Sequence, residues 1–414
     1  HADDDIVKEA NDFTGWGRAA TPTTSIENRL WSQDNWGEDL ILNVRNDNIY
    51  YWDATLGLGN RASALSSQSG ASDAPTVARQ VIVSDADRHV IGLGTNTLGT
   101  TAQDLLLVRW SNQEDPVDWT PTATNTAGSQ RLSSGSEIIT AVETRQELVI
   151  WTDASIYSMR FVGPPFTFSF TLLASNASII SPNAAVAVED RVFWMDTENF
   201  FMYAGQIQTI PCTVLRYIFD DINLAQNQKF FAGSNRMFNE VFWFYCTADS
   251  DDIDRYAKFN YADNTWDIGS LSRTAWGDFG LHDKPRAAGV SSDLNYVYAH
   301  ETGTTADGDA MAPFIESTVF SIGDGEQFAF ISRIVPDIDI TSSSSESVNY
   351  VLKTRDFPGD SLTTNSTSAV TSTTQQSFVR SRSRSAVLRI ESSASDVAWT
   401  LGDVRLDIRP DGRR

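Results

Sequence analysis

A hairpin pattern recurs along this chain and limits the folds that it can adopt. The stretch ELVIWTDASIYSMRFVG at 147–163 holds an apolar run, a short polar break and a second apolar run. Two such runs, rich in β-branched and aromatic residues, are typical of antiparallel strands joined by a tight turn. The same arrangement occurs, wholly or in part, in five more stretches: 38–53, 104–122, 191–206, 240–261 and 293–303.

The spacing of these hairpins predicts a β-propeller. Their first strands start near positions 40, 105, 148, 192, 241 and 296, a period of about 40–50 residues that is typical of four-stranded blades. A lead-in strand precedes three of the hairpins, within 136–145, 183–191 and 230–239. We expect five to seven blades over residues 1–305. An open meander or a β-sandwich with similar strand spacing is the alternative.

Helical periodicity is nearly absent, so the fold class predicted for the whole chain is all-β. The best candidate for a few helical turns is 214–229. After 298–317, where Gly303, Gly308 and Pro313 indicate a linker, the hairpin pattern ends. Residues 306–414 are predicted to form a separate β-sandwich-like platform domain, which contains a Ser/Thr-rich segment at 361–377.

Arginine and serine alternate near the end of the chain, in the stretch Val379–Arg384. If this stretch is a strand, its period of two puts Arg380, Arg382 and Arg384 on one face. Such a strand buries little apolar surface, and three interpretations remain open. It is a solvated edge strand protected by charge, a contact with acidic groups of a neighbouring subunit, or a row that binds DNA phosphates.

The chain is strongly acidic, with 31 basic and 54 acidic residues and a net charge of −23. Residues 376–414 hold eight Arg and five acids, so this segment carries +3 and the remainder −26. Such an acidic chain repels nucleic acid and anionic membranes except where positive charge is concentrated. No apolar run has the length of a membrane helix, and no signal peptide is visible. Two cysteines, Cys212 and Cys246, give no disulfide framework, which fits folding in the cytosol.

The residues give little support for catalysis or metal binding. The four histidines, His1, His89, His282 and His300, are scattered, whereas a metal site needs convergent donors. No Gly-x-Ser-x-Gly stretch or phosphate-binding loop occurs. The turn at 260–269 ends in the Trp of a sialidase-type repeat but lacks its Ser and Gly. We therefore expect no enzyme and assign no catalytic, cofactor-binding or metal-binding residue.

One loop concentrates carboxylates and resembles the start of a calcium loop. It lacks the Gly at the sixth position and the Glu at the twelfth, which is Asn260. A solvated loop is the favoured interpretation. Its acidic residues are Asp249, Asp251, Asp252 and Asp254.

The twelve tryptophans divide into two groups by context. Those at alternating strand positions are predicted to pack between blades: Trp52, Trp151, Trp194 and Trp243. Those in polar stretches are predicted to lie in exposed loops: Trp31, Trp36, Trp110 and Trp119.

Residues 29–53, 108–170, 181–214 and 399–414 resemble tail proteins of short-tailed bacteriophages, variously called tail nozzle, tail hub or DNA-stabilisation proteins. The resemblance implies a virion protein assembled in the host cytoplasm into a ring, expected to be hexameric, at the distal end of the tail. The implied partners are the tail adaptor or tube protein, tail fibres or spikes, and passing viral DNA. The ring would retain the packaged genome and release it, without catalytic residues.

The acidic composition suits such a conduit, because each phosphate contact would slow the passage of DNA. The arginine-bearing domain would then face a neighbouring subunit or the adaptor. The candidate gates of such a channel are the acidic loop at 247–254 and the loop at 67–73, and the sequence does not choose between them. The alternative is a receptor-binding tail protein or a glycan-binding adhesin. A propeller glycan hydrolase is less favoured still.

Overall fold

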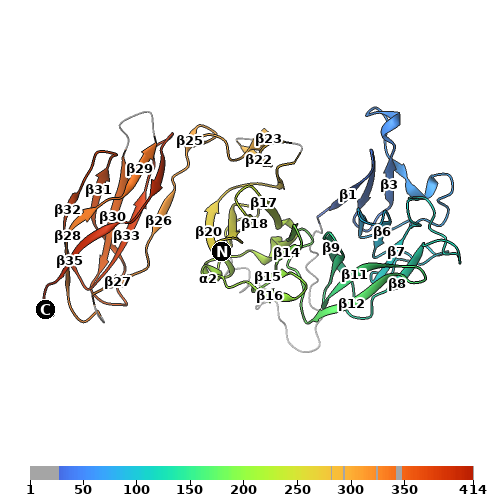
Figure 1. The fold of residues 1–414 in the computed structure, drawn as a ribbon, viewed down its shortest axis with the longest axis horizontal. Helices are drawn as coiled ribbons and strands as arrows, with labels where there is room; N and C mark the ends of the chain where they lie inside the picture. The colour runs from blue at the N-terminus through green and yellow to red at the C-terminus, as the bar shows by residue number, and fades with distance from the viewer. Residues whose placement is uncertain (1–27, 281, 292–293, 323–324, 342–346, 414) are drawn as a thin grey trace, which may run out of the picture. The chain divides into compact units, whose positions relative to one another are not determined.

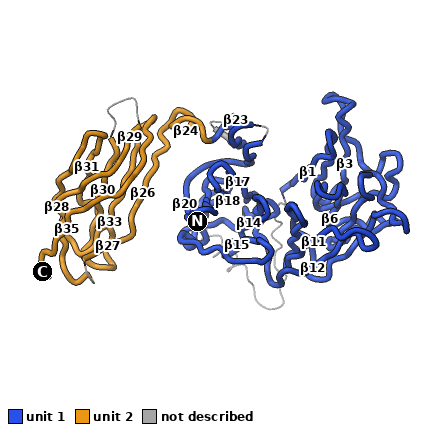
Figure 2. Tube along the Cα trace, in the orientation of Figure 1, with its two compact units in different colours: residues 1–300 blue, residues 301–414 orange. Residues whose placement is uncertain are grey.

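The computed structural model describes residues 28–413 except 281, 292–293, 323–324 and 342–346 (Figure 1). The chain is all-β and divides into two compact units, residues 1–300 and 301–414 (Figure 2). The division falls between His300 and Glu301, close to the 305/306 boundary expected from the sequence.

Unit 1 consists of successive antiparallel sheets, each contiguous in the sequence. The first sheet comprises β1 (Trp31–Trp36), β2 (Asp39–Val44), β3 (Ile49–Trp52) and β4 (Ser63–Ala64). The second comprises β5 (Gln80–Val83), β6 (Val90–Leu93), β7 (Leu107–Trp110) and β8 (Gly128–Arg131). The third comprises β9 (Ile138–Glu143), β10 (Leu148–Thr152), β11 (Ser155–Gly163) and β12 (Thr167–Ser175).

Three more sheets complete the described part of unit 1. The fourth comprises β13 (Ala185–Val188), β14 (Arg191–Met195), β15 (Phe200–Tyr203) and β16 (Ile207–Thr209). The fifth comprises β17 (Phe231–Asn235), β18 (Glu240–Tyr245), β19 (Arg255–Asn260) and β20 (Thr265–Ser270). The sixth has three strands: β21 (Ala275–Gly277), β22 (Arg286–Ser291) and β23 (Leu294–Ala299).

The sheets of unit 1 follow one another in the manner of propeller blades. The first strand of each sheet contacts the first strand of the next, from β1 through β5, β9, β13 and β17 to β21. In a propeller the first strand of each blade lies nearest the axis, so this chain of contacts is the one that blades produce. The predicted fold class is confirmed, with six successive sheets in the described residues, a number within the predicted range.

Four of the predicted hairpins begin at the second strand of a sheet, namely β2, β10, β14 and β18, and the three lead-in strands are β9, β13 and β17. The assignments near positions 105 and 296 were wrong, because β7 and β23 are the third strands of their sheets, and the second strands are β6 and β22. Strand β6, with the sequence VIGL, is buried at all four positions and contains a glycine. It therefore shows no alternation.

Helices are short. The predicted helical stretch contains α2 (Leu215–Phe219) followed by the 3-10 helix η3 (Leu224–Lys229), and two other 3-10 turns are η1 (Ala54–Leu56) and η2 (Leu65–Ser67). Across the described residues, no helix has the length and apolar character needed to cross a membrane.

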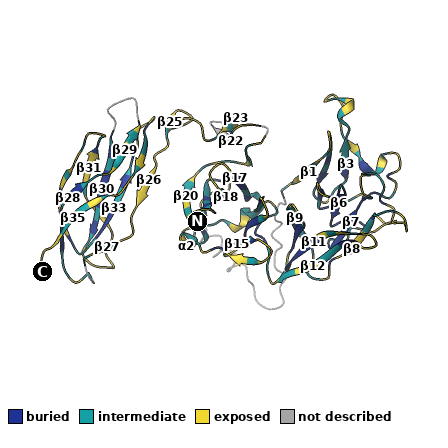
Figure 3. Cartoon of the chain, in the orientation of Figure 1, coloured by how far each residue is buried: buried dark blue, intermediate teal, exposed yellow. Residues whose placement is uncertain are grey.

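Large aromatic side chains pack between the sheets of unit 1. Figure 3 marks the buried residues along the strands in dark blue. Trp151, Trp194 and Trp243 are fully buried, as predicted, whereas Trp52 is half-buried. The rings of Trp151 and Trp194 lie 5.4 Å apart, and the indole N–H of Trp243 donates to the Ala184 carbonyl at 3.2 Å.

The prediction of exposed loop tryptophans was partly wrong. Trp110 ends β7, and Trp119 packs in the core shared by the first two sheets, so both are buried. Trp31 is exposed but opens strand β1, which also contains the half-buried Trp36. The sequence did not reveal the burial of Trp110 and Trp119, because both have polar neighbours. In a strand, such neighbours face solvent at alternate positions.

Unit 2 begins with a small hairpin, β24 (Thr305–Ala306) and β25 (Asp309–Ala310), followed by a β-sandwich. One sheet has the order β26-β33-β30-β31, with β27 also pairing with β33. The facing strands form a sheet β32-β28-β35 and a pair β29-β34. The bounds are β26 (Phe314–Glu316), β27 (Phe320–Ser321), β28 (Ala329–Val335), β29 (Ile338–Thr341), β30 (Val348–Arg355), β31 (Thr363–Val370), β32 (Ser377–Ser383), β33 (Ser385–Glu391), β34 (Ala398–Leu401) and β35 (Arg405–Pro410).

The core of unit 2 lies between these sheets and is separate from the cores of unit 1. Ile331 and Ile334 of β28 meet Tyr350 and Leu352 of β30 and Leu388 of β33 there. The predicted Ser/Thr-rich segment contains β31, an edge strand with most of its side chains exposed.

Candidate functional site

The alternating Arg/Ser stretch forms β32, an edge strand of the β32-β28-β35 sheet. Arg380 and Arg382 are exposed, whereas Ser381 and Ser383 are buried toward the sandwich core. The two faces of the strand therefore separate as the period of two predicts. Arg384 comes directly after the last residue of the strand and is half-buried.

Two of the predicted arginines have partners within unit 2. Arg382 Nε lies 2.7 Å from Asp411 Oδ2, and its guanidinium is 4.0 Å from the centroid of the Phe328 ring. Arg384 donates to the Arg413 carbonyl at 3.3 Å and lies 5.0 Å from the same ring. Among the described residues, none forms an ion pair with Arg380.

Strands β28 and β35 add charged and aromatic residues that the sequence analysis did not single out. Phe330 is in register with both Arg382 and Arg409, and Arg333 is in register with Phe378 and Asp407. Alternation in RLDIRP, where Leu406 and Ile408 pack on the core, was the available signal. We call the outward side of this sheet the arginine face: Phe330, Arg333, Phe378, Arg380, Arg382, Arg405, Asp407 and Arg409.

Stacking and ion pairs hold parts of the arginine face in place. The Arg409 guanidinium lies 4.7 Å from the Phe330 ring centroid. Arg333 Nε lies 2.7 Å from Asp407 Oδ2, and Arg333 also donates to Gln376. Phe378 is 74% exposed. The face thus combines guanidinium groups and aromatic rings on a solvent-exposed sheet, a combination enriched at protein interfaces.

The acidic loop after β18 is tied to its surroundings. Asp254 accepts hydrogen bonds from the backbone N–H and hydroxyl of Thr247, at 2.9 and 2.8 Å. Lys229 Nζ lies 2.9 Å from Asp252 Oδ1 and donates to the Asp251 carbonyl at 2.6 Å. Asp249 and Asp251 are exposed. In the described residues, no three His, Cys, Asp or Glu side chains are placed to hold a metal ion.

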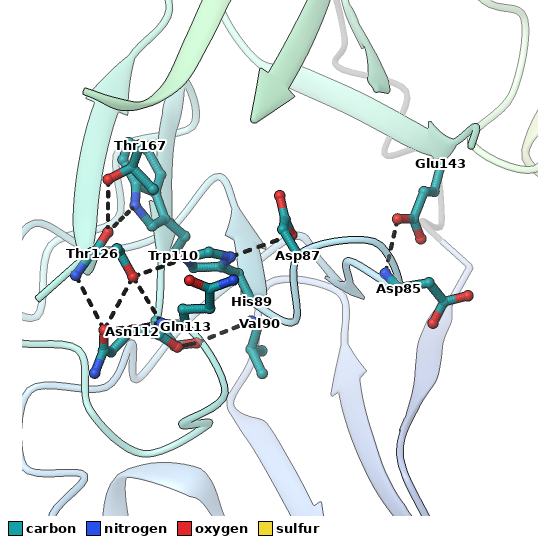
Figure 4. A network of polar contacts seen from close by, with 11 residues as sticks. Asp85, Asp87, His89, Val90, Trp110, Asn112, Gln113, Thr126, Glu143 and Thr167 are labelled. Atoms are coloured by element: carbon teal, nitrogen blue, oxygen red, sulfur yellow. Dashed lines mark hydrogen bonds and ion pairs between the residues drawn. The ribbon is translucent and has the colours of Figure 1, made fainter. Parts of the chain in front are cut away.

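A polar network lies between the second and third sheets (Figure 4). His89 is fully buried, with Nε2 3.0 Å from the Thr126 hydroxyl and Nδ1 3.3 Å from Asp87 Oδ1. The Asn112 side chain accepts from both the N–H and the hydroxyl of Thr126. These contacts join loops of the second sheet, so we interpret the network as structural.

A cavity of about 40 Å³ beside this network is lined by polar and apolar residues, among them Asp87, Glu143 and Glu147. Burial, with added repulsion from Asp85 and Asp34, raises the pKa of Glu143 to about 7. The Glu147 carboxylate accepts hydrogen bonds from the hydroxyls of Tyr203, at 2.7 Å, and Ser158. The cavity has room for little more than water, so we assign no ligand to it.

The other histidines lie elsewhere, and His1 falls outside the described residues. His282 is exposed. His300 accepts from Arg273 Nε at 3.1 Å, and burial together with that guanidinium lowers the pKa of His300 to about 4. Cys212 and Cys246 are free thiols, and burial raises the pKa of each, to about 11 for Cys212.

No protein-family model matches the chain, and no curated protein matches its sequence. Solved β-propeller structures do match, with 8–11% sequence identity. The computationally designed protein Ika8 has a TM-score of 0.38, covering 65% of this chain and 70% of that one. An apocarotenoid oxygenase mutant from Synechocystis has a TM-score of 0.35, covering 67% of each chain. Hsv2p of Kluyveromyces lactis has a TM-score of 0.36, covering 76% of this chain and 93% of that one. These distant likenesses carry no functional assignment.

Proposed function

We propose that this protein is a structural component of a short-tailed phage virion. In this proposal, subunits assemble into the distal ring of the tail, retain the packaged genome and form the conduit for its ejection into the host. The resemblance of four sequence segments to tail nozzle and hub proteins motivates the proposal. The role requires no catalytic residue.

The distribution of charge is the observation that carries the proposal. Residues 1–300 contain 38 acidic and 20 basic residues, a net charge of −18, and residues 301–414 carry −5. A ring of such subunits repels DNA phosphates wherever its carboxylates line the passage. Such a ring retains DNA because its channel is closed, and not because its residues bind the DNA.

The second unit supports a role in assembly. Its arginine face is a basic and aromatic surface on an otherwise acidic protein, and a face of this kind favours a protein partner. The tail adaptor, which the ring would meet at its attachment end, is a second candidate partner for the arginine face. Tail fibres or spikes would attach to the outer surface.

The mass and shape of the purified oligomer test the proposal. Mass photometry and negative-stain electron microscopy are expected to find an annular hexamer with a central opening. Trimers that bind host envelope would instead favour the receptor-binding or adhesin function. A monomer that cleaves members of a glycan panel would favour a hydrolase. Either of these two results would contradict the proposed hexameric ring.

A further inference from the structure

We infer that the arginine face binds the acidic surface of unit 1 in a second copy of this chain. The inference rests on the proposed ring and names the contact that would hold neighbouring subunits together. It goes beyond the predicted arginine row, because the face draws residues from three strands that are far apart in the sequence.

Three arginines of the face have charge available for a partner. Arg380, Arg405 and Arg409 are all exposed. Among the described residues, no carboxylate lies within ion-pair distance of any of the three, whereas Arg333 and Arg382 are paired with Asp407 and Asp411. The face therefore keeps a local positive charge even though unit 2 as a whole is acidic.

Aromatic rings restrict two guanidinium groups of the arginine face before a partner binds. Arg409 is stacked near Phe330 at 4.7 Å, and Arg382 near Phe328 at 4.0 Å. A stacked guanidinium loses less conformational freedom when it binds than a free one does. The exposed ring of Phe378 adds apolar area at the edge of the same sheet. Together these features fit a protein surface better than a bare polyanion.

Charge complementarity identifies the partner as another copy. Unit 1 carries −18, so every neighbouring subunit presents a surface that attracts the arginine face. DNA is also a polyanion, but the exposed Phe378 ring among the arginines suits a protein surface, where carboxylates lie among apolar side chains. The favoured contact therefore joins the arginine face of one subunit to the carboxylates of the next.

A triple charge reversal in the full-length chain tests the inference: Arg380→Glu, Arg405→Glu and Arg409→Glu. A matched control reverses three exposed arginines of unit 1, Arg61, Arg145 and Arg216. Both variants change the net charge equally. Sedimentation velocity over a series from about 0.05 to 0.5 M salt measures self-association, since salt at these strengths screens exposed charges. Circular dichroism checks that each variant is folded.

The wild-type oligomer is expected to dissociate as salt rises. The triple variant should self-associate at least about tenfold more weakly at 0.15 M salt, as expected when charge pairs across an interface are reversed. The control should associate at least as strongly as the wild type does, because it adds negative charge only to the unit that the arginine face is inferred to bind. If the wild-type ring forms and the triple variant assembles equally well, this inference fails while the proposed function stands.

Other results would also overturn the inference. A wild-type monomer at every salt concentration would contradict both the inference and the ring. A change in frictional ratio without a change in mass would show that the face contacts unit 1 of its own chain. Binding of duplex DNA that only the triple variant loses would assign the face to nucleic acid.

Discussion

Glu143 is the last residue of β9 and accepts a hydrogen bond from the backbone N–H of Asp85 at 3.0 Å. Asp34 of β1 accepts one from the Val83 N–H at 2.9 Å. Two carboxylates, one from the first sheet and one from the third, thus bind the same end of the second sheet. Burial first, and then the charges of Asp85 and Asp34, raise the pKa of Glu143 to about 7.

Replacing Glu143 with Gln should therefore change how stability depends on pH. The folded-state pKa exceeds the ordinary value of 4.5, so the glutamate stabilises the fold below about pH 4.5 and loses this contribution as pH rises through 7. At pH 8 we expect Glu143→Gln to raise the free energy of unfolding by about 1–2 kcal/mol, allowing for solvent screening. Urea unfolding at pH 5 and pH 8 measures the difference.

The exposed Glu38, in the turn between β1 and β2, provides the control. Glu38→Gln should leave the free energy of unfolding nearly unchanged at both pH values. A Glu143→Gln variant that is equally destabilised at pH 5 and pH 8 would show that the hydrogen bond to Asp85, rather than the charge, dominates.

Trp243 illustrates the residues that hold neighbouring sheets together. Its ring lies 4.7 Å from that of Phe200 in the fourth sheet and 5.8 Å from that of Trp266. Trp243→Ala removes these contacts and leaves a cavity, so we expect unit 1 to lose about 3–5 kcal/mol of unfolding free energy. The exposed Trp31→Ala should cost less than about 0.5 kcal/mol. Equal losses in chemical denaturation of the two variants would contradict the assignment of Trp243 to the core.

At the scale of single elements, β32 has one face in solvent and one in the core. The hydroxyls of Ser381 and Ser383 are buried and have no hydrogen-bond partner among the described residues. Replacing both with Ala removes two unsatisfied groups, so we expect unit 2 to gain about 1–3 kcal/mol. Differential scanning calorimetry measures the shift, with the exposed Ser372→Ala as control. A lower melting temperature for the double variant would mean that the hydroxyls are satisfied after all.

Elements also show how far the sequence could predict the fold. Alternation identified β10, β14 and β18, because each pairs apolar runs with clear polar turns. It failed for β6, which is buried on both faces. The face around β32 was visible only in part, since Arg333 and Arg409 join it through the sheet order β32-β28-β35. That order follows from long-range pairing, which no local pattern contains.

At the scale of the whole molecule, the two units have separate hydrophobic cores and are joined by an exposed segment. Glu301, Gly303, Asp307 and Gly308 are all exposed, as is Met311. Exposed connections between compact units are the usual sites of limited proteolysis. We expect brief treatment with proteinase K to cleave first within 301–312 and to yield two fragments that remain folded. Mass spectrometry identifies the cut, and earlier cleavage inside any sheet outside 301–312 would contradict the division.

Each four-stranded sheet of unit 1 is complete within one stretch of chain, and its strands pair in the order in which they are synthesised. Pairing between neighbours in sequence closes only short loops, which favours rapid formation. On the ribosome, each sheet can therefore finish its hydrogen bonding before the next one emerges. The sandwich of unit 2 differs, because β28 pairs with β35, and the arginine face is complete only after β35 has been synthesised. A nascent chain would thus become able to recruit a neighbour only once its acidic unit is already made.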